Sequence, residues 1–239
     1  MEKKKLISFI DKYHLAGNAN SVKLEIKDKT LHCKFITDDQ NVIGSVTMNN
    51  FDIEDCVLGV YATSQLTKLL TALDDDINFK VNNADGTAFS INVSDKTTKV
   101  TFMLADLSVI RQVPDLKNTP DWNVSFELTK DFTDKFIKSK NALPETENFA
   151  VQSSNGQAEM ILNYSTLNTN RITWPISIGG TPEDLSATCF SANLFKEILQ
   201  SNKGCEYGEL SVSSAGLAKV VFKHAEGNSS YYLVQLQAS

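Results

Sequence analysis

The residue types that most often carry out chemistry are sparse in this sequence, and their spacing does not suit catalysis. The three histidines, His14, His32 and His224, share no metal-ligand spacing with one another or with the four cysteines. His32 and Cys33 are adjacent in a predicted strand, so their side chains point to opposite faces. Motifs for a serine nucleophile, a phosphate-binding loop or a dinucleotide site are absent from the sequence. We therefore expect no enzyme activity, no metal site and no cofactor.

One acidic run, Asp74–Asp76, has the composition of a cation-binding cluster. It follows a predicted helix, and we interpret it as the end of that helix and a turn of the chain. Aspartates at a helix C-terminus are electrostatically unfavourable, because the exposed carbonyl groups there carry partial negative charge.

The chemistry that the sequence does offer is contact between lysine and phosphate. Four predicted helices contain eleven lysines and five acidic residues, a net charge of +6, whereas the rest of the chain carries −12. Lysine outnumbers arginine strongly, which predicts sequence-independent contact with a phosphate backbone and not bidentate reading of bases. The alternative is that this basic face is only solvated. The lysines predicted to face DNA are Lys4, Lys5, Lys12, Lys68, Lys130 and Lys138.

Helices over 1–14, 62–73, 129–141 and 190–203 must position these lysines. In the first of them, apolar residues recur at i, i+3, i+4 and i+7, which places them on one buried face. These residues are Leu6, Phe9, Ile10 and Tyr13. Each of the other helices shows apolar residues on one side, so the lysines opposite them are expected to be exposed.

The sequence contains an internal duplication. Adding 129 to the residue number aligns Tyr61 with Phe190 and Leu66 with Phe195. Each copy of the repeat is predicted to form a helix followed by three strands with alternating apolar residues. Upstream, a shift of 127 places Cys33 on Met160. The order helix, strands, helix, strands therefore occurs twice. We predict an α+β fold with duplicated domains, each with two helices packed on curved antiparallel sheets. The expected domains are residues 1–112 and 123–239.

Residues 113–122 are predicted to connect the two domains. Two of the five prolines, Pro114 and Pro120, fall in this segment, which favours an extended surface chain. Val113, Leu116 and Trp122 are apolar, which is unusual for a segment that serves only as a spacer. Surface loops often carry binding sites. An inert linker is the alternative.

Composition sets the broad class. The chain has 239 residues, 41% of them hydrophobic, and a net charge of −6. The four cysteines are far apart with no C-x-x-C pair, which predicts free thiols and a reducing, intracellular compartment. We expect neither a signal peptide nor a membrane-spanning segment. The expected location is the cytoplasm, that of the bacterial host if the protein is viral.

The duplicated domains, basic helices, acidic exterior and proline-bearing connector resemble the DNA sliding clamps. The pattern is most similar to the trimeric clamps of T-even-like bacteriophages, and it is clearest in 52–76 and 221–238, where Phe222 and the run Tyr232–Val234 stand. The resemblance implies a closed trimeric ring with the helices lining the hole. It also implies double-stranded DNA, a replicative DNA polymerase and an ATP-dependent clamp loader as partners, and no membrane. One departure is that the first helix starts almost at Met1, which leaves little room for a leading strand.

Two further surfaces are expected on such a ring. Pro175 belongs on a sheet edge, so the strand around it is predicted to pair across a subunit interface with the last strand of the first domain. The alternative is an edge protected within one protomer. The predicted interface residues are Met103, Leu104, Leu107, Ile110, Trp174 and Ile176.

The second surface is a groove for the apolar tail of a polymerase, formed by the connector and the C-terminal strand. Its predicted residues are Val113, Pro114, Leu116, Tyr232, Val234 and Leu236. The last three fit equally well as inward residues of the second domain. Two other classes stay open for the whole chain, a β-rich binding or virion protein that does not encircle DNA, and a hydrolase with an unrecognised site.

Overall fold

The computed structural model describes residues 1–116, 118–167 and 169–236, and these residues form two compact units. Unit 1 comprises Met1–Pro114 and Glu226–Ser229, and unit 2 comprises Asp115–Ala225 and the chain from Ser230 onward. The border after Pro114 falls within the segment predicted to be the connector. All four cysteines are free thiols. No helix among the described residues has the length and apolar character needed to cross a bilayer.

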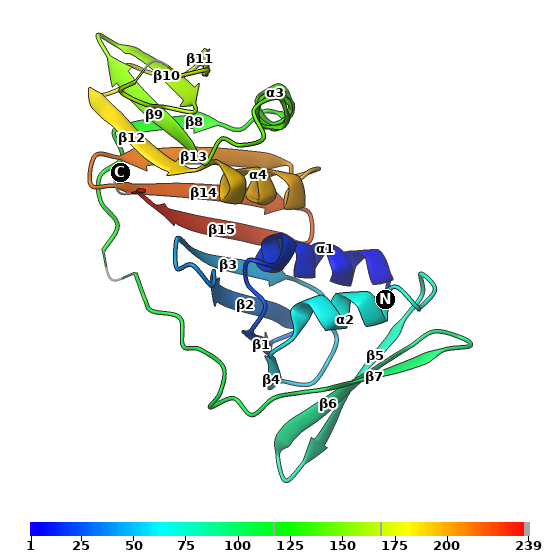
Figure 1. Cartoon of the computed structure of the whole chain (residues 1–239). Coiled ribbons are helices and arrows are strands. Elements are labelled where there is room, and N and C mark those ends of the chain that lie inside the picture. Colours follow the sequence, from blue (N-terminus) through cyan, green and yellow to red (C-terminus); the bar gives the residue numbers. More distant parts are fainter. Residues whose placement is uncertain (117, 168, 237–239) are drawn as a thin grey trace. The chain divides into compact units, whose positions relative to one another are not determined.

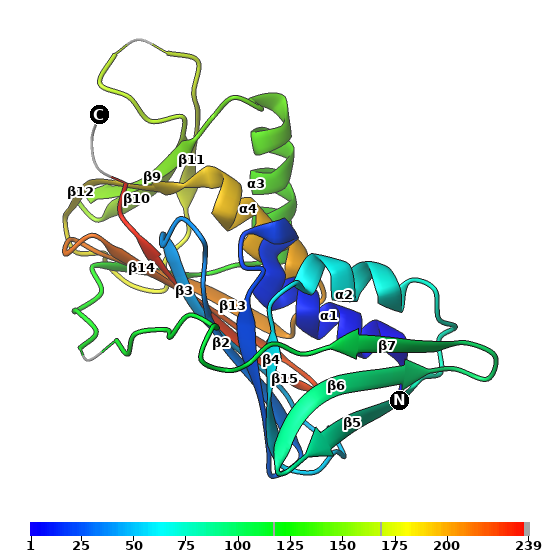
Figure 2. The same cartoon turned by 60° about the horizontal axis from the view of Figure 1, so that its bottom comes forward.

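Unit 1 contains two helices, two antiparallel sheets and a short 3₁₀ turn, Leu15–Gly17 (Figure 1). Its elements in chain order are α1 (Lys3–His14), β1 (Val22–Lys27), β2 (Thr30–Ile36), β3 (Val42–Met48), β4 (Cys56–Val60), α2 (Thr63–Leu70), β5 (Asn78–Ala84), β6 (Thr87–Ser94) and β7 (Lys99–Met103). The strand order is β4-β1-β2-β3 in one sheet and β5-β6-β7 in the other. Helices α1 and α2 contact each other; α1 packs on β2 and β3, and α2 on β7. Figure 2 shows the two helices side by side over the strands.

Helix α1 forms where the apolar spacing predicts it. Its buried residues are Leu6, Phe9, Ile10 and Tyr13, as expected from the sequence. The helix ends at His14, and its C-cap residue, Leu15, adopts a left-handed conformation with φ of 46°.

The residues before α1 form a short antiparallel pairing, although the sequence leaves little room there for a leading strand. Lys3 N donates to Asp75 O, and Ile77 N donates to Met1 O. A β-bridge joins Glu2 to Asp76. The backbone of the aspartate run therefore pairs with the first residues of the chain, just before the segment that leads into β5.

Unit 2 repeats this order of elements (Figure 1). Its elements are β8 (Val124–Glu127), α3 (Lys130–Ala142), β9 (Asn148–Ser154), β10 (Gln157–Leu162), β11 (Ile172–Ile176), β12 (Leu185–Ser191), α4 (Ala192–Ser201), β13 (Tyr207–Ser213), β14 (Leu217–His224) and β15 (Gly227–Val234). One sheet has the order β11-β10-β9-β12, and β15, β14, β13 and β8 are neighbours in a second sheet. The first residues of β15 are grouped with unit 1, where Asn228 N donates to Thr47 Oγ1 at 3.0 Å.

The two copies of the repeat differ in their leading aromatic residue. Phe190 is fully buried in unit 2, whereas Tyr61 is 57% exposed in unit 1. The following helix positions agree better, because Leu66 and Phe195 are both buried. Ser191 Oγ caps α4 by accepting from Leu194 N at 3.3 Å.

An aromatic cluster forms the core of unit 2. Phe136 on α3 lies 5.6 Å from Phe149 and 4.8 Å from Phe195, measured between ring centroids. Trp174 on β11 joins the cluster at 6.3 Å from Phe136 and is only 4% exposed. Its indole Nε1 is buried without a hydrogen-bond partner among the described residues. Trp174 is therefore a core residue of its own protomer.

We predict that Trp174→Ala destabilises the protein by about 3–5 kcal/mol, the usual cost of removing a buried large aromatic side chain. Urea unfolding of unit 2 measures the change through the shift in midpoint. The exposed neighbour Thr173 provides the control, since Thr173→Ala removes no buried surface. Equal midpoints for the two variants would contradict the core placement of Trp174.

Candidate nucleic-acid interface

The lysines of unit 1 predicted to face DNA lie on the helix pair α1 and α2. Lys4 and Lys68 are exposed, and Lys5 and Lys12 are half-buried. Lys4 lies opposite the buried residues of α1, whereas Lys5 lies on the flank of the helix and reaches Glu226 in the turn before β15. Among the eleven lysines counted in the sequence, Lys3 is not free to face a ligand, because its Nζ donates to Leu73 O.

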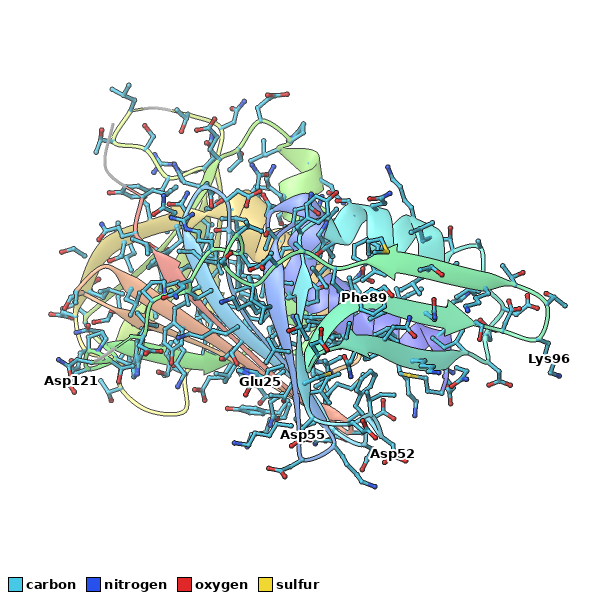
Figure 3. All side chains as sticks on the ribbon, turned by 90° about the horizontal axis from the view of Figure 1, so that it is seen from below. Glu25, Asp52, Asp55, Phe89, Lys96 and Asp121 are labelled. Atoms are coloured by element: carbon cyan, nitrogen blue, oxygen red, sulfur yellow. The ribbon has the colours of Figure 1, made fainter. Side chains whose placement is uncertain are left out.

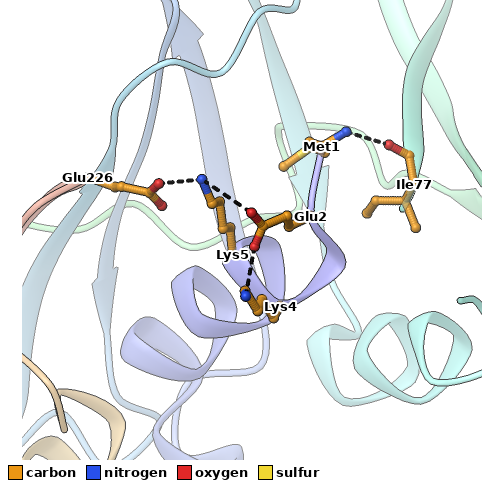
Figure 4. Close-up of polar contacts among 6 residues, drawn as sticks. All are labelled: Met1, Glu2, Lys4, Lys5, Ile77 and Glu226. Carbon is orange, nitrogen blue, oxygen red and sulfur yellow. Dashed lines mark hydrogen bonds and ion pairs between the residues drawn. The ribbon is translucent and has the colours of Figure 1, made fainter. Parts of the chain in front are cut away.

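Lys4 and Lys5 take part in an ion-pair cluster at the start of α1, shown in Figure 4. Lys4 Nζ lies 3.0 Å from Glu2, and Lys5 Nζ lies 2.5 Å from Glu226. The hydrogen bond from Lys4 lowers the pKa of Glu2, and the hydrogen bond to Glu226 raises the pKa of Lys5. Exposed ion pairs of this kind are weak, so a phosphate group can compete for these lysines.

The other two lysines of unit 1 that are predicted to face DNA are Lys12 and Lys68. Lys12 Nζ donates to Ser8 Oγ at 2.7 Å, one helical turn earlier. Lys68 lies in the last turn of α2, where a cation interacts favourably with the helix dipole.

In unit 2 the exposed lysines Lys130 and Lys138 lie on α3. They are eight residues apart, and Asp134 lies midway between them on the same side of α3. This side of the helix therefore carries both positive and negative charge. Lys135 is placed differently, with its Nζ 5.4 Å from the centre of the Trp174 ring.

Lys140 does not belong to the candidate interface although it contributed to the charge count of the helices. It is 5% exposed, and its Nζ donates to Pro144 O at 2.7 Å. Burial, followed by repulsion from Lys196, lowers the pKa of Lys140. The accessible positive charge of the helices is therefore smaller than their composition suggests.

The predicted subunit-interface residues separate into exposed and buried side chains. Met103 is 59% exposed, and Leu104 and Leu107 are half-buried. Ile110, Trp174 and Ile176 are buried in the protomer, so a subunit contact at these positions would involve the backbone and not these side chains. Period-2 alternation in a strand cannot tell which face meets the protomer's own helices, and in β11 that face carries Trp174 and Ile176.

The strand edges themselves are open among the described residues. Strand β7 lies at one edge of the β5-β6-β7 sheet of unit 1, and β11 lies at one edge of the β11-β10-β9-β12 sheet of unit 2. The predicted strand pairing there would involve backbone groups and not the buried side chains.

The residues predicted to bind a partner tail are accessible to different degrees. Leu116 is 39% exposed and Val234 is 45% exposed, while Pro114 is exposed and Val113 half-buried. Tyr232 and Leu236 are half-buried, and Leu236 N donates to Cys189 O at 2.9 Å. The inward positions of β15 are Tyr231 and Leu233, at 0% and 1% exposed. The alternative that Tyr232, Val234 and Leu236 are the inward residues is therefore wrong.

The described residues offer no alternative metal chemistry. No group of three or more His, Cys, Asp or Glu side chains in this part of the chain is arranged to hold a metal ion. His14, His32 and His224 form part-buried hydrogen bonds with Ser64, Ser45 and Asn202 respectively.

Comparison with known proteins shows similarity in structure and not in sequence. No model of a known protein family matches the sequence, and no curated protein is significantly similar to it. Proliferating cellular nuclear antigen from Entamoeba histolytica is similar with a TM-score of 0.74 at 15% identity, over 99% of this chain and 97% of that one. The PCNA2–PCNA3 complex from Sulfolobus tokodaii gives 0.74 at 13%, over 98% and 97%. A structure of the C-terminal region of FEN-1 bound to A. fulgidus PCNA gives 0.76 at 12%, over 100% and 98%.

These similarities extend over both units, so they concern the whole arrangement of helices and strands within each of them. The predicted α+β fold with four helices and antiparallel sheets is confirmed. The chain has the fold of the DNA sliding clamps.

Proposed function

We propose that this protein is a sliding clamp that encircles double-stranded DNA without reading its sequence. The observation that carries the proposal is a clamp fold that spans the whole chain, together with exposed lysines on the helices of both units. Three protomers would close the ring, with Lys4, Lys5, Lys12, Lys68, Lys130 and Lys138 facing the phosphates. The lysines would neutralise phosphate charge while the ring slides, since no fixed base contact has to break.

We further propose that the ring tethers a replicative DNA polymerase, and that an ATP-dependent loader places it on DNA. The clamp itself would be a non-enzymatic scaffold without a cofactor. The sequence pattern in 52–76 and 221–238 supports a T-even-like bacteriophage relative. The second candidate, a β-rich phage binding or virion protein that does not encircle DNA, is disfavoured by the match to the clamp fold in both units.

The native mass tests the assembly. A chain of 26.4 kDa should sediment as a single species of three times that mass at micromolar concentration. A monomer that persists as the concentration rises would contradict a closed ring and favour the second candidate.

Leu116 provides a test of the proposed partner groove. We predict that Leu116→Asp leaves the trimer and its melting temperature unchanged, because this side chain is 39% exposed and contributes little to either core. The same variant should abolish stimulation of the cognate polymerase on a long primed template, since a charge in an apolar groove removes an anchor contact.

Val109→Asp serves as the matched control, because Val109 is also an exposed apolar residue, at 69%, and lies outside the predicted groove. It should retain full stimulation. If Leu116→Asp also stimulates fully, the polymerase binds elsewhere on the ring.

A further inference from the structure

Strand β5 forms one edge of the β5-β6-β7 sheet, and no other described strand pairs with its outer side. Figure 2 shows β5 and β7 on opposite sides of this sheet. Strand β7 carries the edge proposed for subunit contact and precedes the connector, so the β5 edge is a separate surface of unit 1. An open strand edge offers a row of backbone donors and acceptors to another chain.

The register of β5 shows which of its backbone groups point outward. Leu104 N donates to Phe89 O, so the odd-numbered residues of β6 bond to β7 and the even-numbered ones bond to β5. Lys80 pairs with an even-numbered residue of β6 and therefore uses both of its backbone groups within the sheet. Its neighbours Phe79 and Val81 present their N–H and C=O groups to the open edge.

The second copy of the duplication shows what covers the corresponding edge. Adding 129 to the residue numbers of β5 gives the bounds of β13. There β8 pairs antiparallel with β13, and Gly208 O accepts a hydrogen bond of 2.8 Å from the residue after β8. Gly208 and Leu210 are the counterparts of Phe79 and Val81. The backbone positions that bond to a strand in unit 2 are therefore open in the described part of unit 1.

Pairing on this side of unit 1 stops just before β5. Among the described residues it joins residues 1–3 to 75–77, with Met1 N donating to Ile77 O at 2.8 Å. A strand docked on β5 would continue this pairing along the sheet. It would also bury apolar surface, because Val81 is half-buried whereas its counterpart Leu210 is 0% exposed.

The side chains of β5 favour a particular kind of strand. In unit 2, β8 places an apolar residue opposite Leu210, and it places Glu127 opposite Glu209. The corresponding positions of β5 carry Val81 and Lys80. Opposite charges directly across two strands stabilise their pairing, whereas like charges weaken it. A strand with the pattern of β8 would therefore suit β5 better in charge than it suits β13.

The surroundings of Lys80 leave its charge available to one carboxylate. Lys80 is exposed and forms no ion pair with a described residue. Asp76 and Asp85 lie four and five residues away, beyond the two ends of β5. At about 3.3 Å per residue they are further from Lys80 than the screening length of roughly 8 Å.

The edge is also built to discourage unspecific pairing. A lysine and a β-bulge both hinder the addition of a strand, and β5 has Lys80 and a shift of register between Asn82 and Asn83. A carboxylate opposite Lys80 turns this obstacle into a contact. The bulge limits regular pairing to the first half of β5.

We propose that the outer edge of β5 binds an extended segment of a partner protein, which joins the sheet as an added strand antiparallel to β5. The backbone groups of Phe79 and Val81 would bond to this strand. An apolar residue of the partner would pack on Val81, and the carboxylate of the next residue would pair with Lys80. The site goes beyond the proposed clamp function, because it lies within unit 1 and needs neither a ring nor DNA.

The test is a titration of the intact protein with the synthetic peptide Ac-Asn-Val-Ser-Phe-Glu-Leu-NH₂, which has the sequence of residues 123–128. Binding is followed by calorimetry and by amide shifts of labelled protein. We expect saturable binding with shifts centred on β5 and β6. The matched ligand contains N-methyl-phenylalanine, which keeps the side chain but lacks the N–H that would bond to Val81 O. It should not bind.

Reciprocal charge reversal tests the register. Lys80→Glu should weaken binding of the glutamate peptide about fivefold, and it should strengthen binding of a peptide with lysine in place of glutamate. Lys96→Glu is the control variant, since Lys96 is exposed in the β6–β7 turn and not on β5. It should bind both peptides like the unaltered protein.

A backbone variant tests strand addition independently of charge. Val81→Pro removes an outward N–H without breaking a bond to β6, so it should abolish binding. Val81→Thr keeps the N–H and should bind normally. If the melting temperature shows that the proline variant does not fold, the N-methylated peptide provides the same test on the unaltered protein.

Three results would overturn the proposal. They are equal binding of the N-methylated peptide, equal effects of Lys80→Glu and Lys96→Glu, and shifts centred on β13, which would indicate exchange with β8. None of these results bears on whether the protein encircles DNA.

Discussion

Reversing the charge of three helix lysines, Lys68, Lys130 and Lys138, is expected to weaken binding to duplex DNA at least tenfold at low salt. All three are exposed and have no ion-pair partner among the described residues. Each phosphate that is no longer neutralised reduces the slope of log K against log salt by about 0.9. The variant should therefore show both lower affinity and a shallower dependence on salt. Its melting temperature should change little, since exposed side chains away from the core contribute little to stability.

Lys27, Lys80 and Lys96 provide a control that changes the net charge by the same amount. All three are exposed on strands or turns of unit 1, and Lys96 lies at the tip of the β6–β7 turn (Figure 3). Reversing them to glutamate should affect DNA binding much less than reversing the helix lysines. If both triple variants lose the same affinity and slope, total charge governs binding, and the helix faces have no special role.

The second large effect is expected from Thr101→Pro, which should convert the trimer to monomers. Leu104 N donates to Phe89 O, and both N–H and C=O groups of a strand residue point to the same side. By alternation, Phe102 bonds to β6, whereas Thr101 and Met103 present their backbone groups to the open edge of β7. Proline at position 101 removes an outward N–H without breaking a bond to β6.

The backbone groups of β11, the proposed partner edge, alternate in direction in the same way. Asn163 N donates to Asn148 O, so Met160 and Ala158 face β11 and bond to Trp174 and Ile176. Thr173 and Pro175 therefore present their backbone to the open edge. The missing N–H of Pro175 lies on the edge, as expected for a proline in a sheet.

Analytical ultracentrifugation distinguishes the outcomes, with Thr101→Ala as the matched control. Both substitutions remove the bond from Thr101 Oγ1 to Asn92, but only proline removes the backbone donor. The alanine variant should stay trimeric. A trimer of unchanged stability in the proline variant would show that this edge is not the interface.

The sequence predicted the helices well because one signal, apolar spacing, determines both their position and their buried face. All four buried residues expected in α1 are buried, and the helix ends at His14, as predicted. Strand positions were predictable for the same reason, since the alternation of β1 and β2 is continuous.

Side-chain direction in strands was less predictable. Trp174 was expected at an interface but packs on Phe136, because the sequence does not show which face of an edge strand receives a helix. In β15 the apolar residues form a continuous run, and both alternating sets fit it. Burial of Tyr231 and Leu233 decides between them only once the fold is known.

The opposed lysines of β1 and β2 were missed although part of their signal was present. The tight turn at Asp28–Lys29 fixes the register of β1 on β2, and that register places Lys23 opposite Lys34. The position of Arg111 could not be predicted, because it depends on the path of the chain after β7, which follows from the contact between Ala105 and Gly59.

The central claim is that the protein encircles DNA, and topology tests it most directly. The protein is incubated at high concentration with linear duplex, so that rings can thread over free ends, and both ends are then blocked with streptavidin. The complex is washed at about 1 M salt, where charges are screened within roughly 3 Å. We predict that protein is retained through this wash and is released when a restriction enzyme cuts the duplex. Loss of the protein in the wash despite blocked ends, or its retention after cutting, would contradict a ring around DNA.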